Sequence, residues 1–194
     1  MLARLRRPAV LVPTALVLVA VMGVGLYLFQ PWRLFVNTTV DEASPLAVST
    51  PAVSPPAEDD GAATTPAPEE SPSVAAQATV IATGEFISHE HGTSGTVSVI
   101  ALPGGDRVLR IEGLDTSNGP DLHVWLSDAP VIEGRDGWFV FDDGDYADLG
   151  ELKGNRGNQN YRIPATVDLG DLTSVTIWCD RFSVSFGAAE LVAA

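Results

Sequence analysis

Cys179 is the only cysteine in the chain, and its side chain is the most chemically reactive type present. A single cysteine cannot form an intrachain disulfide, and a zinc site built from several cysteines is also excluded. Two interpretations of Cys179 stay open. It is either a buried residue acting as a small hydrophobe, or a redox thiol or thiolate ligand to a cofactor. Arg181 favours the thiolate by lowering its pKa, whereas the nearer Asp180 opposes it.

Three histidines, His89, His91 and His123, are the next candidates for chemistry. In an extended strand His89 and His91 fall on one side, which suits a metal ion, but a polar loop edge explains the same pair. No histidine follows Cys179 and no methionine lies in the C-terminal region, so a blue-copper site is a poor match. The C-x-x-C-H motif of covalent haem attachment is absent. We therefore assign no metal site.

Two polar segments complete the candidates. Four aspartates, at positions 142, 143, 145 and 148, form an acidic cluster that suits weak calcium binding but lacks the spacing of a calcium loop. Residues 153–160 are rich in glycine and asparagine, which predicts a structured turn. No spaced nucleophile motif such as G-x-S-x-G occurs, so the sequence contains no recognisable catalytic set.

The elements that position these residues are short strands. Runs of β-branched and aromatic residues alternate with Gly, Asn and Asp through residues 79–194. Seven or eight short antiparallel strands in one domain predict an all-β fold, either a β-sandwich or a small barrel. The predicted strands are 79–86, 95–102, 107–113, 121–127, 138–141, 160–163, 174–179 and 182–186.

The last two predicted strands determine where Cys179 points. Side chains alternate between the two faces of a strand, so Cys179 shares a face with Val175 and Ile177. Phe182, Val184 and Phe186 share a face of the next strand. Both sets can face the core only if residues 180–181 form a bulge or a turn. We therefore expect Cys179 to point inward at the edge of the core.

The N-terminal region predicts a membrane anchor. Residues 9–29 are apolar and uncharged, and at 1.5 Å per residue they can cross a bilayer core of ~30 Å. The run is longer than a signal-peptide core and ends in aromatic residues, which favours an uncleaved signal-anchor. Three arginines precede the run and one follows it closely. The positive-inside rule then predicts residues 1–8 in the cytoplasm and the C-terminal domain outside it, in a single-pass protein of the cell membrane.

Residues 30–78 predict a linker. Pro, Ala, Ser, Thr, Asp and Glu dominate them, and such a composition cannot bury enough apolar area to offset the entropy of ordering. We therefore expect a disordered extracytoplasmic tether between the membrane helix and a domain at 79–194. Prolines and mutually repelling carboxylates would extend it and lift the domain off the membrane.

The net charge is -14, from 25 acidic and 11 basic residues. Such a chain repels nucleic-acid phosphates, and no basic stripe is present, so we exclude nucleic acid as a partner.

Three motifs in the C-terminal region resemble the electron-transfer DM-thirteen domain family. They are GPDLHVWLS at 119–127, LGELKGNRGNQNYRIP at 149–164 and VTIWCDRFSVSFG at 175–187, and residues 84–86 and 91–95 also fit. The resemblance covers residues 83–191. It implies an extracellular or cell-surface redox system, in which the family's cysteine, here Cys179, is a bare thiol or binds a prosthetic group such as haem.

Two main functions follow as expectations. The first is a membrane-anchored redox or electron-transfer module that uses Cys179 and exchanges electrons with a redox or cell-envelope protein. The alternative is a non-catalytic binding module of the cell envelope in which Cys179 is structural. A calcium-dependent adhesion domain is a third option. In all three cases the protein is an electron-transfer or binding module rather than a turnover enzyme.

Overall fold

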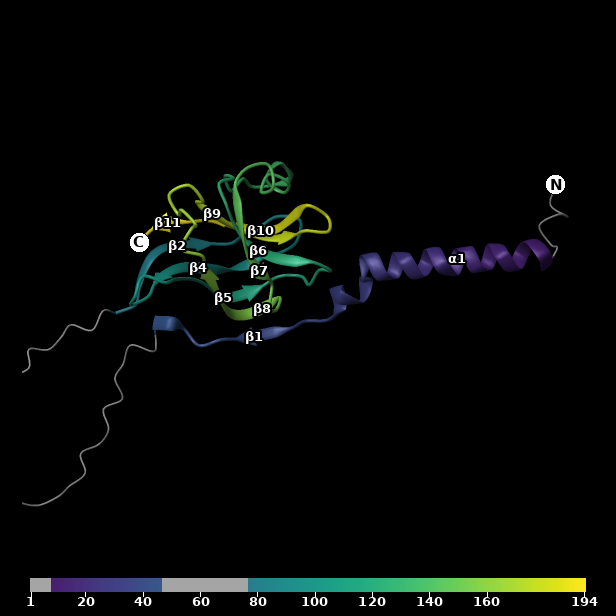
Figure 1. The fold of residues 1–194 in the computed structure, drawn as a ribbon, viewed down its shortest axis with the longest axis horizontal. Coiled ribbons are helices and arrows are strands. Elements are labelled where there is room, and N and C mark those ends of the chain that lie inside the picture. Colours follow the sequence, from purple (N-terminus) through teal and green to yellow (C-terminus); the bar gives the residue numbers. More distant parts are fainter. Residues whose placement is uncertain (1–7, 47–76) are drawn as a thin grey trace, which may run out of the picture.

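The computed structural model describes residues 8–46 and 77–194 (Figure 1). An α-helix, α1 (Pro8–Phe29), is followed by a 3₁₀ turn, η2 (Pro31–Phe35), and a second 3₁₀ turn, η4 (Arg135–Gly137), lies between strands. The strands are β1 (Thr39–Asp41), β2 (Thr79–Glu85), β3 (Ile87–Ser88), β4 (Ser94–Ala101), β5 (Arg107–Asp115), β6 (Leu122–Ser127), β7 (Tyr146–Glu151), β8 (Arg156–Ile163), β9 (Ser174–Cys179), β10 (Val184–Glu190) and β11 (Val192–Ala193).

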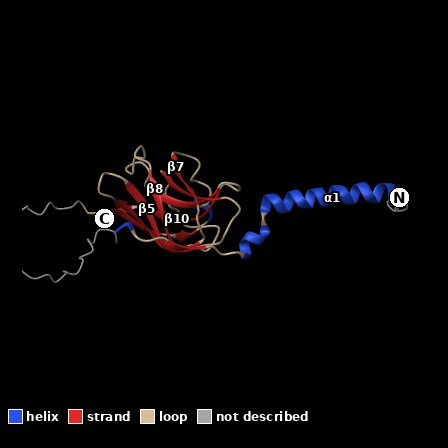
Figure 2. Cartoon of the chain, turned by 60° about the horizontal axis from the view of Figure 1, so that its bottom comes forward, coloured by secondary structure: helices blue, strands red, loops and turns tan. Residues whose placement is uncertain are grey.

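The strands form two sheets packed face to face, so the predicted all-β sandwich is confirmed (Figure 2). One sheet has the order β1-β8-β5-β4-β2-β11 and the other has the order β3-β10-β9-β6-β7. The described strands number eleven rather than seven or eight, because β1, β3 and β11 are each only two or three residues long. All pairings are antiparallel except that between β1 and β8.

The main core lies between the two sheets. Alternate residues of β4 and β5 face alternate residues of β6, β9 and β10 across it, as period-two patterning requires. The buried residues of this core are Phe86, Val97, Val99, Leu109, Ile111, Leu114, Leu122, Val124, Leu126, Tyr161, Ile163, Leu172, Val175, Ile177, Cys179, Val184, Phe186 and Ala189.

The strand predicted at 138–141 is wrong. Residues 138–141 form turns after η4 instead, and the neighbouring strand is β7, which the sequence did not predict. The aromatic residues of this segment pack on two different clusters, Trp138 on the main core and Phe141 on a second cluster outside the β9 sheet. Their side chains therefore lack the single buried face that a strand would give them.

Part of the predicted disordered linker is a strand. Residues 39–41 form β1, which pairs in parallel with β8 in the register Thr39 to Arg156, Val40 to Gly157 and Asp41 to Asn158. We call residues 37–43 the strap, because they lie along the domain between the end of η2 and residues 47–76 (Figure 1). The predicted disorder of residues 47–76 lies outside the described residues.

Hydrogen bonds join the strap to residues 153–160, the segment predicted to be a polar turn. Most of this segment belongs to the strand β8. Thr38 N–H donates to Asn155 Oδ1 at 2.8 Å, and Glu42 N–H donates to the Asn158 carbonyl at 2.9 Å. Gly157 has φ +97, and a Cβ there would overlap the Val40 carbonyl oxygen. Glycine is thus required where the strap passes.

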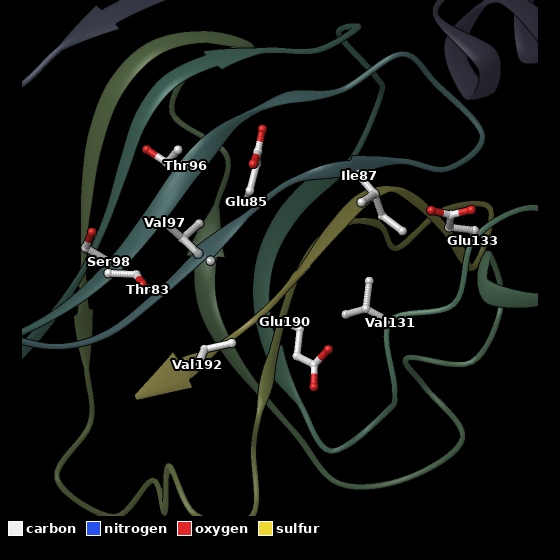
Figure 3. A pocket seen from close by; sticks show the side chains of 11 residues that line it. Thr83, Glu85, Ile87, Thr96, Val97, Ser98, Val131, Glu133, Glu190 and Val192 are labelled. Atoms are coloured by element: carbon white, nitrogen blue, oxygen red, sulfur yellow. The ribbon is translucent and has the colours of Figure 1, made fainter. Parts of the chain in front are cut away.

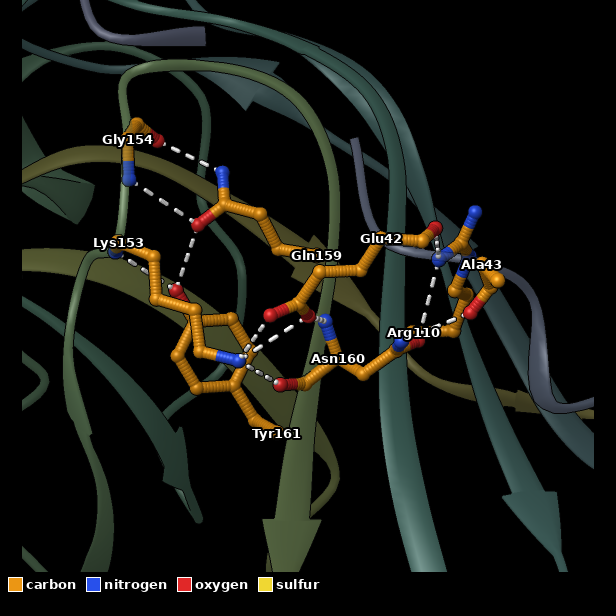
Figure 4. A network of polar contacts seen from close by, with 8 residues as sticks. All are labelled: Glu42, Ala43, Arg110, Lys153, Gly154, Gln159, Asn160 and Tyr161. Atoms are coloured by element: carbon orange, nitrogen blue, oxygen red, sulfur yellow. Dashed lines mark hydrogen bonds and ion pairs between the residues drawn. The ribbon is translucent and has the colours of Figure 1, made fainter. Parts of the chain in front are cut away.

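Glu42 is the most highly connected residue of the strap (Figure 4). Its carboxylate accepts from Lys153 Nζ at 2.8 and 3.0 Å and from Asn160 N–H at 2.6 Å. Its carbonyl accepts from the buried Arg110 guanidinium at 2.6 Å. These bonds lower the pKa of Glu42, with the Lys153 hydrogen bond as the main cause. The strap therefore joins the domain through charge-assisted bonds as well as through its backbone.

Helix α1 has the length and composition of a membrane span, because residues 11–29 have a mean hydropathy of 2.3 and none of them is buried. Its end touches the domain. Phe29 stacks on Phe182 with ring centroids 5.7 Å apart, and Arg181 Nη1 donates to the Leu28 carbonyl at 2.8 Å. Beyond the helix, Arg33 Nη1 donates to the Gly119 carbonyl at 3.2 Å. The strap and these contacts place the domain directly beside the end of the helix.

Candidate functional site

Cys179 is the last residue of β9 and points inward, as predicted. It pairs with Leu122 of β6 on one side and with Val184 of β10 on the other, so its strand is central in the sheet. Its side chain has no exposed surface and packs in the main core with Val175, Ile177 and Val184. The thiol therefore cannot be reached by a bulky reagent in this conformation.

The electrostatic surroundings keep the thiol protonated. Burial is the largest cause of the shift and raises the pKa of Cys179. Hydrogen bonds from the backbone amides of Phe182 and Arg181 act in the opposite direction and lower the pKa. The carboxylates of Asp121 and Glu90 raise the pKa further. Asp180, the acid expected to act on the thiol, is exposed. Thiol–disulfide exchange needs an accessible thiolate, so this arrangement disfavours it.

The turn after Cys179 lies against the end of α1. Residues 180–183 form the turn that the alternation required, and Ser183 has φ +47 within it. Phe182 was expected on the core face with Val184 and Phe186, but its side chain is 45% exposed and stacks on Phe29 instead. Cys179 is thus two residues from Arg181 and three from Phe182, both of which contact α1.

A hollow of about 280 Å³ lies beside the contact between the end of α1 and the domain. Mostly aromatic and apolar side chains line it, among them Phe29, Phe182, Phe186 and His91. Its volume lies near the lower limit of small-molecule sites, about 300–1,000 Å³. Cys179 does not line it. The described residues around Cys179 therefore do not fit a haem held by this thiolate, and we derive no step through such a group.

The histidines do not converge. His89 is buried, contacts Ser185 Oγ through Nδ1 at 2.7 Å and packs near Phe141. The His91 ring packs on Phe186 at a tilt of 35°, with ring centroids 3.9 Å apart. The chain bends at residues 89–91 rather than continuing as a strand, so the expected common side is lost. Burial lowers the pKa of both histidines.

His123 lies on the other face of the sheet from Cys179, because it pairs with Trp178 whereas Leu122 pairs with Cys179. His123 Nδ1 is 3.0 Å from Asp148 Oδ2, and its Nε2 is 3.6 Å from Asp121 Oδ1. Within residues 8–46 and 77–194, no three histidine, cysteine or acidic side chains are grouped as metal ligands would be. The four aspartates at 142–148 therefore do not form a calcium cage in the described part of the chain.

A second hollow is an open groove of about 700 Å³ beside β2 and β4 (Figure 3). Glu85, Glu133 and Glu190 stand around its apolar floor, which includes Val97 and Val131. No histidine, cysteine or basic residue lines it. Carboxylate and hydroxyl side chains line the groove beside its apolar floor, and Cys179 is not among its lining residues.

Sequence reasoning missed two features of the structure. One is the strap, since its partners on β8 lie more than a hundred residues away along the chain. The other is a row of stacked aromatic rings, Tyr146, Trp125 and Trp178, on the outer face of the β9 sheet. A signal for the second feature was present. Trp178 adjoins Cys179 in the sequence, and strand alternation places its ring on the opposite face.

Comparison with known proteins gives one match. The family described as electron transfer DM13 matches residues 85–191, which is more than half of the chain and includes β4 to β10. No curated protein and no solved structure matches the chain.

Proposed function

The chain belongs to the electron transfer DM13 family, and from this we propose that it is a membrane-anchored electron-transfer module in which Cys179 carries the redox property. The family match over residues 85–191 is the observation that supports the proposal most strongly. In this proposal α1 anchors the protein as an uncleaved single span. The arginines before the helix favour a cytoplasmic N-terminus and an extracytoplasmic domain.

The burial of Cys179 favours electron transfer over sulfur chemistry. Disulfide exchange requires a partner sulfur to touch the thiolate. An electron can instead tunnel through packed protein to a residue that no partner touches. Oxidation of the buried thiol to a thiyl radical would give one electron to a redox or cell-envelope protein and one proton to water, and the raised pKa of Cys179 opposes the loss of that proton.

The test is protein-film voltammetry on the full chain in detergent, with native protein, Cys179→Ser and Val184→Ala compared. Val184 is the cross-strand partner of Cys179, so Val184→Ala disturbs the same packing but keeps the thiol. We expect a redox wave in the native protein and in Val184→Ala and its loss in Cys179→Ser. If Cys179→Ser keeps the wave, the role of Cys179 is refuted.

A second candidate function is a non-catalytic binding module. The same burial supports it, because a fully enclosed cysteine also packs as a small hydrophobe. In that case the native chain would be silent in voltammetry, and its thiol would resist alkylation until the protein unfolds.

A further inference from the structure

Three aromatic rings form a continuous stack on the outer face of the β9 sheet. Tyr146 and Trp125 are nearly parallel, with ring centroids 4.1 Å apart and planes 8° apart. Trp125 and Trp178 follow at 5.2 Å and 28°. Offset stacking of this kind is a favourable arrangement of aromatic rings. These separations also bring the π-systems close enough for fast electron hopping, since tunnelling falls off exponentially with distance.

The stack crosses three strands diagonally, from β7 through β6 to β9. Trp125 pairs with Asp148 and Thr176, so Tyr146 and Trp178 are its diagonal neighbours on the same face. The outer ring, Tyr146, is 48% exposed, whereas Trp125 and Trp178 are 4% and 1% exposed. The stack therefore connects the surface with the residue bonded to Cys179.

The indole N–H of Trp125 is buried and has no hydrogen-bond partner among the described residues. A buried donor without an acceptor is unfavourable. With no acceptor in contact, an oxidised Trp125 has nowhere to send its proton and stays a radical cation. It can then be reduced again by an electron alone, without a proton having to return.

We propose that Tyr146, Trp125 and Trp178 are the route by which single electrons pass between the surface and the strand that holds Cys179. The inference rests on the proposed electron-transfer function and specifies its path. A one-electron oxidant first takes an electron from Trp178. Trp125 then donates an electron to the oxidised Trp178, and Tyr146 donates an electron to the oxidised Trp125. Tyr146 then releases its phenol proton to water and becomes a neutral tyrosyl radical. The oxidant is reduced by one electron, so charge and protons balance.

The experiment places an oxidant at the inner end of the route. Asp180 is exposed and Cys179 is fully buried, so Asp180→Cys in the full chain in detergent takes a thiol-reactive ruthenium polypyridyl label selectively. Illumination with a cobalt(III) ammine as final electron acceptor generates ruthenium(III) at position 180. We expect a tyrosyl radical in the paramagnetic resonance spectrum, and its loss in Tyr146→Phe. Tyr161→Phe should keep it.

The tryptophans are tested in the same labelled background. Trp125→Phe and Trp178→Phe should each lose the tyrosyl signal, while Trp138→Phe, the same change outside the stack, should keep it. Equal radical yields in Trp125→Phe and Trp138→Phe, or a signal that survives Tyr146→Phe, would overturn the proposal.

Two variants, Tyr146→Phe and Cys179→Ser, keep the result interpretable. Tyr146→Phe leaves the half-exposed ring in place, so it decides the outcome even if a tryptophan variant fails to fold. The route begins at Trp178, so Cys179→Ser should keep the tyrosyl signal. Voltammetry therefore tests the role of Cys179, and the tyrosyl signal tests the aromatic route. Failure of one proposal can be told from failure of the other.

Discussion

Burial raises the pKa of two residues, Cys179 and Tyr161, that face the main core from opposite sheets. The Tyr161 hydroxyl donates to Gln159 Oε1 at 2.7 Å and accepts from Lys153 N–H at 3.1 Å. Burial is the main cause that raises the pKa of Tyr161 to about 12. Both groups are therefore held in their neutral forms by the fold.

We predict that alkali weakens the fold through Tyr161. The unfolded phenol has a pKa of about 10, so Tyr161 contributes its full stability below that pH and loses it as the pH rises toward about 12. The free energy of unfolding should fall by up to about 1.4 kcal/mol per pH unit from this group. Urea unfolding of the native chain and of Tyr161→Phe at several pH values checks this. Identical alkaline slopes in the two proteins would contradict it.

At the scale of single residues, alternation along β9 was enough to predict that Cys179 points inward, because the strand is regular to its last residue. The same rule failed for His89 and His91, since the chain bends between them. It also failed for Phe182, which the turn releases to meet Phe29. Alternation holds only where a ladder of hydrogen bonds keeps the chain extended.

The strap is the element that sequence reasoning could not predict. Its composition is that of a disordered linker, and three residues are too few for a strand signal. Pairing with β8 holds the strap in place. The glycines and amide side chains of β8 had predicted a turn at residues 153–160. An edge strand that accepts an extended segment supplies backbone bonds to almost any sequence, so the pairing is set by the partner rather than by the strap.

We predict that Glu42→Ala loosens the strap without unfolding the sandwich. The change removes acceptors for Lys153 Nζ and Asn160 N–H, worth roughly 1–2 kcal/mol. The amide hydrogens of Glu42 and Arg156 should therefore exchange about tenfold faster, because about 1.4 kcal/mol corresponds to a factor of ten.

Asp106→Ala is the matched control for the strap. Asp106 accepts from Arg162 in an ion pair whose side chains are both largely exposed, and such pairs contribute about 0–1 kcal/mol. Its loss should leave exchange at Glu42 and Arg156 unchanged. Equal acceleration in both variants would show that Glu42 has no special role in docking the strap.

For the whole molecule, the strap changes the expected arrangement. The tether was expected to separate the domain from the membrane. Instead, η2 and the strap join α1 to the domain directly, because the strap pairs with β8 (Figure 1). The overall sandwich followed from short, punctuated strands, but the position of the domain beside the helix depends on contacts between distant parts of the chain.

This arrangement means that the covalent bond through residues 47–76 is not the only attachment of the domain. We predict that a protease site inserted there can be cut while the C-terminal piece stays in the membrane pellet, held by residues 8–46. Glu42→Ala combined with Asn155→Ala should release it after cutting. Acid should do the same, because the lowered pKa of Glu42 means that its contribution is lost as the pH falls. A domain found in the supernatant immediately after cutting would contradict this. A single proteolytic cut would thus convert a permanent anchor into a reversible one that pH controls.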